Sequence, residues 1–420
     1  MNKIVVRGGK PLSGRVEIGG SKNAALPLLF AGILTGDVCV FYALPRVSDV
    51  LLTLEILRCL GARIRFAEGG AVTVDYRDIR PVLPSHTLTG AIRGSVYLLG
   101  AMLGRFGKAA LAGAGGCDFG LRPIDQHLAG FAAMGAVEHT ADGVLCLTAE
   151  KGLSPVEFQL KMPSVGATAN LLMAATSAKG TTVIKNAAAE PHVAALCDFL
   201  IGAGAEITGV HTDTLTVRGG KPLHGCTFTV IPDMIEAGTY LAAAMACGGR
   251  VTVMGADPTH LGATLAALGE MGATLLVGER EVTIIAPDSY RSISLETGPY
   301  PALPTDLHPQ LATLFAIGGR AVGVGRMTER VWQSRFRYTE ELLKMGASLS
   351  VDDTLLTVHP APLHAATVHA PDLRGGVALL IAALATEGQS VITNAAVIGR
   401  GYEHLEAKLQ ALGADVRVIG

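Results

Sequence analysis

The seven residues VRGGKPL occur twice in this chain, at positions 6–12 and again at positions 217–223. The second copy follows a helical pattern that ends at Gly204, and it has the pattern of a final β-strand. The first copy lies at the start of the chain, where no such helix precedes it. We therefore expect the N-terminal segment to supply a strand that another part of the fold lacks.

An internal repeat identifies that part of the fold. A helical pattern ending in Gly-Ala and followed by a strand recurs roughly every 70 residues, at Gly61, Gly135, Gly204, Gly272, Gly346 and Gly413. Glycine suits the left-handed position that ends a helix. The last repeat stops at Gly420, one strand short, so residues 1–21 most simply complete it.

Each repeat is expected to contain the same elements in the same order. A very apolar helix comes first, for example at residues 25–35, 95–103 and 167–178. A short strand, a loop, an amphipathic helix and two further strands follow. The first helix is hydrophobic nearly all round and must be buried, whereas the second has a polar face that can meet water. The sequence thus predicts an α/β fold of inner helices and outer strands.

Six repeats in 420 residues exceed what one hydrophobic core usually serves, which indicates two domains of three repeats. One domain is predicted at residues 22–231. The other is discontinuous and joins residues 1–21 to residues 232–420. The chain would cross between the domains twice at equivalent places, an arrangement that suits a hinge.

The composition excludes several classes of protein. Hydrophobic residues make up 49% of the chain, yet no apolar run approaches the roughly 20 residues of a membrane span. The first residues read as a strand and lack the apolar core of a secretion signal, so we expect a cytoplasmic protein. A net charge of −2 without a basic run argues against nucleic-acid binding. The seven cysteines form no CxxC pair, which indicates neither zinc nor a disulfide framework.

Polar residues collect at one position of the repeat, the start of the apolar helix. They are Ser21 to Asn23, Arg93, Ser164 to Gly166, Asp233 with Glu236, Thr305 with Asp306, and Asp372 to Arg374. Helix starts offer unpaired N–H groups, so several of them at a cleft between domains would bind an anion. Ser21, Ser164 and Thr305 could instead be ordinary N-caps, and the acids could simply complement the helix dipole. Basic residues oppose the helix dipole and need another reason, which makes Lys22, Arg93 and Arg374 informative.

One cysteine has surroundings that suit reactivity. Cys117 lies in the loop GGCDFG at residues 115–120, with Arg122, Asp125 and His127 just beyond. A thiol among glycines and near a guanidinium can be exposed, partly ionised and mobile. The alternative is that the glycines form a turn in which Cys117 fills a gap.

Two further residues are candidates for substrate chemistry. Asp306 follows Pro304 and Thr305, a rigid approach that would fix a carboxylate able to accept a proton, although it could also be a capping residue. Arg400 lies between Gly399 and Gly401, where the backbone can approach a ligand closely. A solvated loop arginine is the alternative for Arg400.

Five motifs in this order resemble the UDP-N-acetylglucosamine 1-carboxyvinyltransferase family, over about residues 7–418. They are SKN at 21–23, the cysteine loop with RPIDQH at 122–127, PSVGAT at 163–168, PTD at 304–306 and RGYE at 400–403. The resemblance implies a pair of inside-out α/β barrels and transfer of the enolpyruvyl group of phosphoenolpyruvate to the 3′-hydroxyl of UDP-N-acetylglucosamine. It also implies loss of phosphate by addition and elimination, in peptidoglycan synthesis, without a metal or organic cofactor.

The resemblance also assigns roles to residues. Lys22, Arg122 and Arg400 would hold phosphoenolpyruvate, Cys117 would be the acid and thiol of the mobile loop, and Asp306 would be the base. The substrate-binding residues would include Lys22 and Asp306. The sugar-nucleotide site itself would be lined by Asn23, Arg93, Arg122, Pro123, Ile124, Asp125, Gln126, Ser164, Val165, Gly166 and Val331. A polar network of the closed state would contain Glu190, Asp233, Arg335, Asp372 and Arg374.

Three positions depart from the family pattern and bear on nucleotide affinity. Gln126 stands where an apolar side chain often packs on the uracil, Met162 where a lysine can reach the diphosphate, and Gly399 where an acid is common. Two alternatives keep the same architecture. One is the enolpyruvyl transferase that acts on shikimate 3-phosphate, and the other is a catalytically silent sugar-nucleotide binding protein.

Overall fold

The computed structural model describes residues 3–113, 123–141, 143–332 and 335–420. These residues form two compact units. Unit 1 comprises residues 3–19 and 232–420, and unit 2 comprises the described residues from 20 to 231. Within the described ranges, none of the helices has the length and hydropathy that crossing a bilayer requires.

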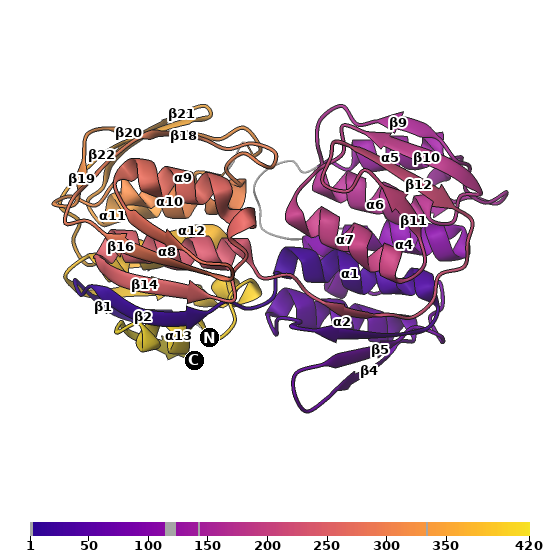
Figure 1. The fold of residues 1–420 in the computed structure, drawn as a ribbon, viewed down its shortest axis with the longest axis horizontal. Helices are drawn as coiled ribbons and strands as arrows, with labels where there is room; N and C mark the ends of the chain where they lie inside the picture. The colour runs from indigo at the N-terminus through magenta and orange to yellow at the C-terminus, as the bar shows by residue number, and fades with distance from the viewer. Residues whose placement is uncertain (1–2, 114–122, 142, 333–334) are drawn as a thin grey trace. The chain divides into compact units, whose positions relative to one another are not determined.

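Unit 2 contains three repeats of inner helices and outer sheets (Figure 1). Its apolar helices are α1 (Lys22–Thr35), α4 (Tyr97–Phe106) and α6 (Val165–Ala175), each followed by a second helix, α2 (Ser48–Leu60), α5 (Asp125–Ala133) or α7 (Pro191–Gly202). The short helices α3 (His86–Thr89) and η1 (Arg93–Val96) precede α4. The sheets have the orders β13-β3-β5-β4, β6-β8-β7 and β11-β12-β10-β9. Their strands are β3 (Val38–Tyr42), β4 (Arg63–Phe66), β5 (Val72–Asp75), β6 (Lys108–Leu111), β7 (Val137–Ala141), β8 (Val144–Thr148), β9 (Glu157–Gln159), β10 (Gly180–Lys185), β11 (Glu206–Thr208), β12 (Thr214–Gly219) and β13 (Thr227–Thr229).

Unit 1 repeats this plan with different loops (Figure 1). Its apolar helices are α8 (Met234–Cys247), α10 (His308–Leu314) and α12 (Leu373–Ala385), and its second helices are α9 (Gly262–Met271), α11 (Tyr338–Lys344) and α13 (Leu405–Ala411). The short helices are η2 (Pro258–Leu261), η3 (Thr305–Leu307) and η4 (Ala395–Arg400). The sheets have the orders β15-β16-β14-β2, β18-β20-β22-β21 and β23-β24-β1-β25, with a small pair β17-β19. Their strands are β1 (Lys3–Gly8), β2 (Leu12–Glu17), β14 (Gly249–Met254), β15 (Thr274–Val277), β16 (Glu281–Ala286), β17 (Tyr290–Arg291), β18 (Ser294–Glu296), β19 (Ala321–Val322), β20 (Gly325–Thr328), β21 (Ser348–Asp352), β22 (Leu355–His359), β23 (Thr367–His369), β24 (Gly388–Thr393) and β25 (Asp415–Ile419).

The predicted donation of an N-terminal strand is confirmed. β1 pairs antiparallel with β24 on one side and with β25 on the other, so it takes the place of the strand that the sixth repeat lacks. In the third repeat, β12 holds the corresponding position between β10 and β11. The indigo β1 accordingly lies among yellow C-terminal elements in Figure 1.

A parallel strand also precedes several of the apolar helices, which the sequence patterns did not predict. β9 pairs in parallel with β10, and β23 with β24, within the same repeat. At the two chain crossings the pairing is exchanged instead. β2 pairs with β14 of unit 1 although it precedes α1, and β13 pairs with β3 of unit 2 although it precedes α8.

The predicted helix ends are confirmed, because all six Gly-Ala glycines have positive φ angles between 90° and 115°. The predicted burial of the first helices is also confirmed, since the residues of α1 from Ala24 to Ile33 are buried. The expectation of a polar face on every second helix is wrong for α7. Residues Pro191 to Cys197 are all buried, because this helix is apolar nearly all round and packs on α1.

Candidate active site

Lys22 is held at the junction of two helix starts in unit 2. Ser21 caps α1, and its hydroxyl oxygen accepts a hydrogen bond from the Ala24 N–H at 3.4 Å, as expected of an N-cap. The Lys22 ammonium lies 3.2 Å from a carboxylate oxygen of Asp49, in the first turn of α2. The Asp49 side chain is 4% exposed and that of Lys22 is 12% exposed. A buried carboxylate therefore offsets the cost of placing a cation at a helix start.

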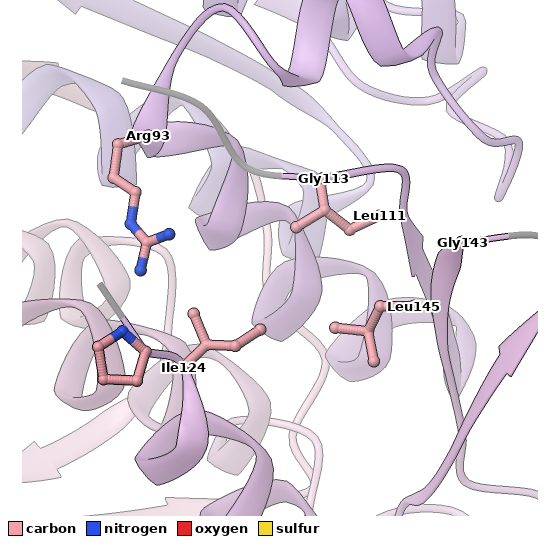
Figure 2. A pocket seen from close by; sticks show the side chains of 7 residues that line it. Arg93, Leu111, Gly113, Ile124, Gly143 and Leu145 are labelled. Atoms are coloured by element: carbon pink, nitrogen blue, oxygen red, sulfur yellow. The ribbon is translucent and has the colours of Figure 1, made fainter. Parts of the chain in front are cut away.

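Arg93 lines a cavity of about 310 Å³ in the same unit. The other lining residues are Leu111, Gly113, Pro123, Ile124, Gly143 and Leu145. Figure 2 shows the Arg93 guanidinium above Ile124, with Leu111 and Leu145 across from them. Burial lowers the pKa of Arg93, partly opposed by Tyr97, although an arginine still remains charged. A guanidinium against apolar side chains can bind a planar group that carries an acceptor or a negative charge.

Gln126 connects the start of α5 to the segment that leads into α6. Its side-chain oxygen accepts hydrogen bonds from the backbone N–H groups of Lys161 at 2.7 Å and Met162 at 3.3 Å. Gln126 therefore joins two segments of unit 2 through its side chain. Asp125, in the first turn of α5, is exposed.

The start of α6 packs closely on α5. Ser164 caps α6 and accepts from the Ala167 N–H at 3.3 Å, and Val165 and Gly166 form the first helical residues. A Cβ atom added to Gly166 would lie 2.8 Å from Nε2 of His127, so a larger residue at this position would require the His127 ring to shift. Burial, together with the nearby Arg93, lowers the pKa of His127 to about 4, with Asp125 opposing this effect. His127 is therefore neutral near pH 7.

Glu190 immediately precedes α7, whose first residue is Pro191. One of its carboxylate oxygens is buried without a hydrogen-bond partner among the described residues. Cys117 and Arg122, which the sequence also assigns to the site, lie outside the described residues.

In unit 1, Asp306 is held by two buried arginines. Its Oδ1 accepts from Arg335 at 2.8 Å, and its Oδ2 accepts from the two nitrogens of Arg374 at 3.1 and 3.3 Å. The arginine side chains are 1% and 2% exposed, whereas that of Asp306 is 27% exposed. Burial opposes the charge of Arg374, but Tyr402, Asp306 and Asp233 outweigh burial and raise its pKa. Asp306 is thus not the capping residue that the sequence left possible, but the exposed member of a charged triad.

Two further acids at the helix starts cap their helices. Asp233 caps α8 by accepting from two N–H groups, at 2.8 and 3.1 Å, and Asp372 caps α12 in the same way at 2.9 and 3.0 Å. The capping alternative is wrong for Thr305, whose hydroxyl donates to Glu329 at 2.9 Å. The basic side chain of Arg374 is explained by its contact with Asp306.

Arg400 is the last residue of the short helix η4 rather than a loop residue. The following Tyr402 anchors this segment, because its hydroxyl lies 2.8 Å from that of Thr239 and 3.3 Å from the amide nitrogen of Gln310. The Arg374 guanidinium lies over the Tyr402 ring, 5.3 Å from its centroid. Unit 1 therefore connects the segment of Arg400 to the triad of Asp306, Arg335 and Arg374. Val331 follows β20, and its N–H donates to Glu329 at 2.8 Å.

Sequence patterns did not identify Asp49 and Glu329 as candidates. Asp49 follows Ser48 at the start of an amphipathic helix, where an acid is ordinary, and Glu329 is a single acid after a strand. Neither position carries a pattern that distinguishes it from other acids in the chain.

Comparisons with known proteins show which family the chain belongs to. The family model described as EPSP synthase (3-phosphoshikimate 1-carboxyvinyltransferase) matches residues 6–409. UDP-N-acetylglucosamine 1-carboxyvinyltransferase 2 of Clostridium acetobutylicum is 42% identical over 420 residues, 99% of each chain. The UDP-N-acetylglucosamine 1-carboxyvinyltransferase of Shewanella frigidimarina is 39% identical over 418 residues, again 99% of each chain.

Solved structures show the same fold. The enolpyruvyl transferase NikO from Streptomyces tendae has a TM-score of 0.89 at 29% identity, covering 99% of this chain and 98% of that one. EPSP synthase from Acinetobacter baumannii has a TM-score of 0.73 at 17% identity over the whole of both chains, which supports the fold alone. The predicted α/β class, with two inside-out barrel domains of three repeats, is confirmed, and the chain belongs to the UDP-N-acetylglucosamine 1-carboxyvinyltransferase family of enolpyruvyl transferases.

Proposed function

We propose that this protein transfers the enolpyruvyl group of phosphoenolpyruvate to the 3′-hydroxyl of UDP-N-acetylglucosamine and releases phosphate. The observation that carries the proposal is the full-length identity of 42% to a protein of that name, covering 99% of both chains. Similarity to EPSP synthase at 17% identity gives no comparable support for shikimate 3-phosphate as the acceptor.

Asp306 is the proposed base of the transfer. A carboxylate that removes a proton from a hydroxyl must be reachable by the substrate and held in one orientation. Asp306 meets both conditions, because 27% of its side chain is exposed while Arg335 and Arg374 bind both of its oxygens.

Lys22, Arg122 and Arg400 are proposed to bind phosphoenolpyruvate, whose phosphate and carboxylate require several cations. The exposed part of Lys22 and the anchored segment of Arg400 support their part in this proposal. Cys117 is proposed as the acid and thiol of turnover. Arg93, Pro123 and Ile124 are proposed to bind the sugar nucleotide in the cavity that they line.

An assay of phosphate release tests the proposal directly. The protein is incubated with phosphoenolpyruvate and either UDP-N-acetylglucosamine, shikimate 3-phosphate or no acceptor. We expect phosphate only with the first acceptor, and a product that mass spectrometry identifies as the enolpyruvyl ether of the sugar nucleotide. Phosphate release with shikimate 3-phosphate but not with UDP-N-acetylglucosamine would identify the transferase that acts on shikimate 3-phosphate. Binding of UDP-N-acetylglucosamine in calorimetry without release of phosphate would identify a silent sugar-nucleotide binding protein.

A further inference from the structure

Glu329 of unit 1 is a buried carboxylate whose partners are mostly neutral. It follows β20, and 1% of the residue is exposed. Burying a carboxylate is costly unless hydrogen-bond donors replace the lost water. The donors around Glu329 therefore show what its charge holds in place.

Glu329 receives hydrogen bonds from three separate segments. Its Oε1 accepts from the Thr297 hydroxyl at 2.9 Å and from the N–H groups of Val331 at 2.8 Å and Trp332 at 3.1 Å. Its Oε2 accepts from the Thr305 hydroxyl at 2.9 Å. An ionised carboxylate can accept all four bonds. The side-chain amide of a glutamine has the same size, but its NH2 group would face some of these donors and could not accept from them.

His308 closes the remaining side of Glu329. Its Nδ1 lies 3.2 Å from Oε2, and neither side chain is exposed. Burial lowers the pKa of His308, and although burial alone would raise the pKa of Glu329, the His308 ring and the surrounding donors lower it. Within the described residues Nδ1 makes no hydrogen bond of good geometry, and Nε2 lies 3.4 Å from the Tyr338 hydroxyl, where the tautomer of His308 decides which atom donates.

Two of the segments that Glu329 anchors carry residues of the candidate active site. Thr305 directly precedes Asp306, and Val331 is a proposed nucleotide-lining residue. Asp306 is consequently restrained from two directions. Arg335 and Arg374 hold its carboxylate, and Glu329 holds the residue before it.

We propose that Glu329 is a positioning residue, which fixes Asp306 and the Val331 backbone for enolpyruvyl transfer without touching the substrate. Its burial keeps it from direct contact, and the network reaches the reacting groups through Thr305 and Val331. This inference rests on the proposed function for its kinetic consequences, but its structural consequence is independent of the substrate.

Glu329→Gln tests the inference, with Glu296→Gln as the matched control. Glu296 lies on β18 of the same sheet and pairs with Arg330, but 57% of its side chain is exposed. For Glu329→Gln we expect kcat/KM for UDP-N-acetylglucosamine to fall at least about tenfold, because hydrogen bonds to a charged group are lost. We expect the KM for phosphoenolpyruvate to stay within about twofold, as in the control. Comparable increases in the KM values of both substrates would show a general structural defect and overturn the inference.

Thr305 provides a second test that does not depend on the folding of Glu329→Gln. Thr305→Val removes the hydroxyl that Glu329 binds and keeps the shape, whereas Thr305→Ser keeps the hydroxyl. We expect the valine variant to lower kcat/KM for the sugar nucleotide and the serine variant to restore most of the activity. In the double variant with Glu329→Gln, the losses should be less than additive. Additive losses, or a fully active Thr305→Val, would contradict the proposed route through Thr305.

Crystal structures of the wild type and of Glu329→Gln, or of Thr305→Val if the first does not fold, separate this inference from the proposed function. We expect residues 305–306 and 331–332 to be displaced in the variant and unchanged in Glu296→Gln. An inactive wild type with every acceptor would refute the proposed function, and the crystallographic comparison would still decide the positioning role. If Asp306 had the same position in the variant as in the wild type, the positioning role of Glu329 would be overturned.

Discussion

Both units place an ion pair at the start of an apolar helix, but the exposed member of the pair differs. In unit 2 the carboxylate of Asp49 is nearly buried and the ammonium of Lys22 is the more exposed group. In unit 1 the guanidinium groups of Arg335 and Arg374 are buried and the carboxylate of Asp306 is partly exposed. The more exposed group is the one that a ligand can reach. In the proposed function, unit 2 would therefore offer a cation to an anionic substrate, whereas unit 1 would offer a base to a hydroxyl group.

The largest expected effect comes from removing the exposed carboxylate. We expect Asp306→Asn to lower kcat by about a thousandfold, since general base catalysis contributes in this range. The affinity for UDP-N-acetylglucosamine should change little, because a proton acceptor is lost rather than a packing group. Stopped and continuous phosphate assays measure kcat, and calorimetry measures the affinity.

Asp257→Asn serves as the control for this variant. Asp257 caps the short helix η2 in the same unit and accepts from the Thr259 N–H at 3.0 Å. It should leave kcat near that of the wild type. Near-normal turnover in Asp306→Asn would show that Asp306 is not the base, and it would contradict the proposed contrast between the units.

Removing a buried partner should affect stability instead. Arg374→Gln leaves Asp306 with one arginine and takes a cation from a fully buried position, so we expect about 3 kcal/mol of destabilisation. Arg330→Gln breaks an exposed pair with Glu296 and should cost less than about 1 kcal/mol. Denaturant unfolding compares the two. Equal destabilisation would mean that burial does not distinguish the triad from a surface pair.

The cation of unit 2 should act on substrate binding. We expect Lys22→Gln to raise the KM for phosphoenolpyruvate by about tenfold or more, because a charge-assisted hydrogen bond to an anion is lost. Lys185→Gln removes an exposed lysine of the same unit that pairs with Glu157, and it should leave this KM unchanged. A KM change confined to the sugar nucleotide would assign Lys22 to the other substrate.

The smallest expected effect concerns the pH dependence of stability. The pKa of His127 is lowered to about 4 by burial and by Arg93. As the pH falls below about 6.5, the unfolded imidazole gains a proton while the folded one stays neutral, so stability decreases. At pH 5.5 this loss is about 1 kcal/mol.

His127→Gln should abolish this part of the pH dependence, and His139→Gln, at an exposed position of the same unit, should not. Thermal unfolding of the three proteins between pH 7.5 and 5 measures the difference. An unchanged pH profile in His127→Gln would show that this ring does not stay neutral in the folded protein.

Parts of the candidate site could be predicted because local patterns mark them. Four polar residues that the sequence places at the starts of apolar helices act as N-caps, namely Ser21, Ser164, Asp233 and Asp372. The partner of a charged side chain could not be predicted from such patterns. Asp49 and Glu329 are joined to Lys22 and Thr305 by contacts 27 and 24 residues apart in the sequence, which no local pattern specifies.

The amino-acid sequence alone determined the six repeats, the helix ends and the burial of the first helices, since each depends on residues close together in the chain. Glycine at a left-handed position and an apolar helix surface act within a few residues of themselves. The tertiary structure decided the exchange of β2 and β13 between the units, the burial of α7, and which member of each ion pair is exposed. These features depend on which distant segments pack together, and burial then sets how much each charge contributes.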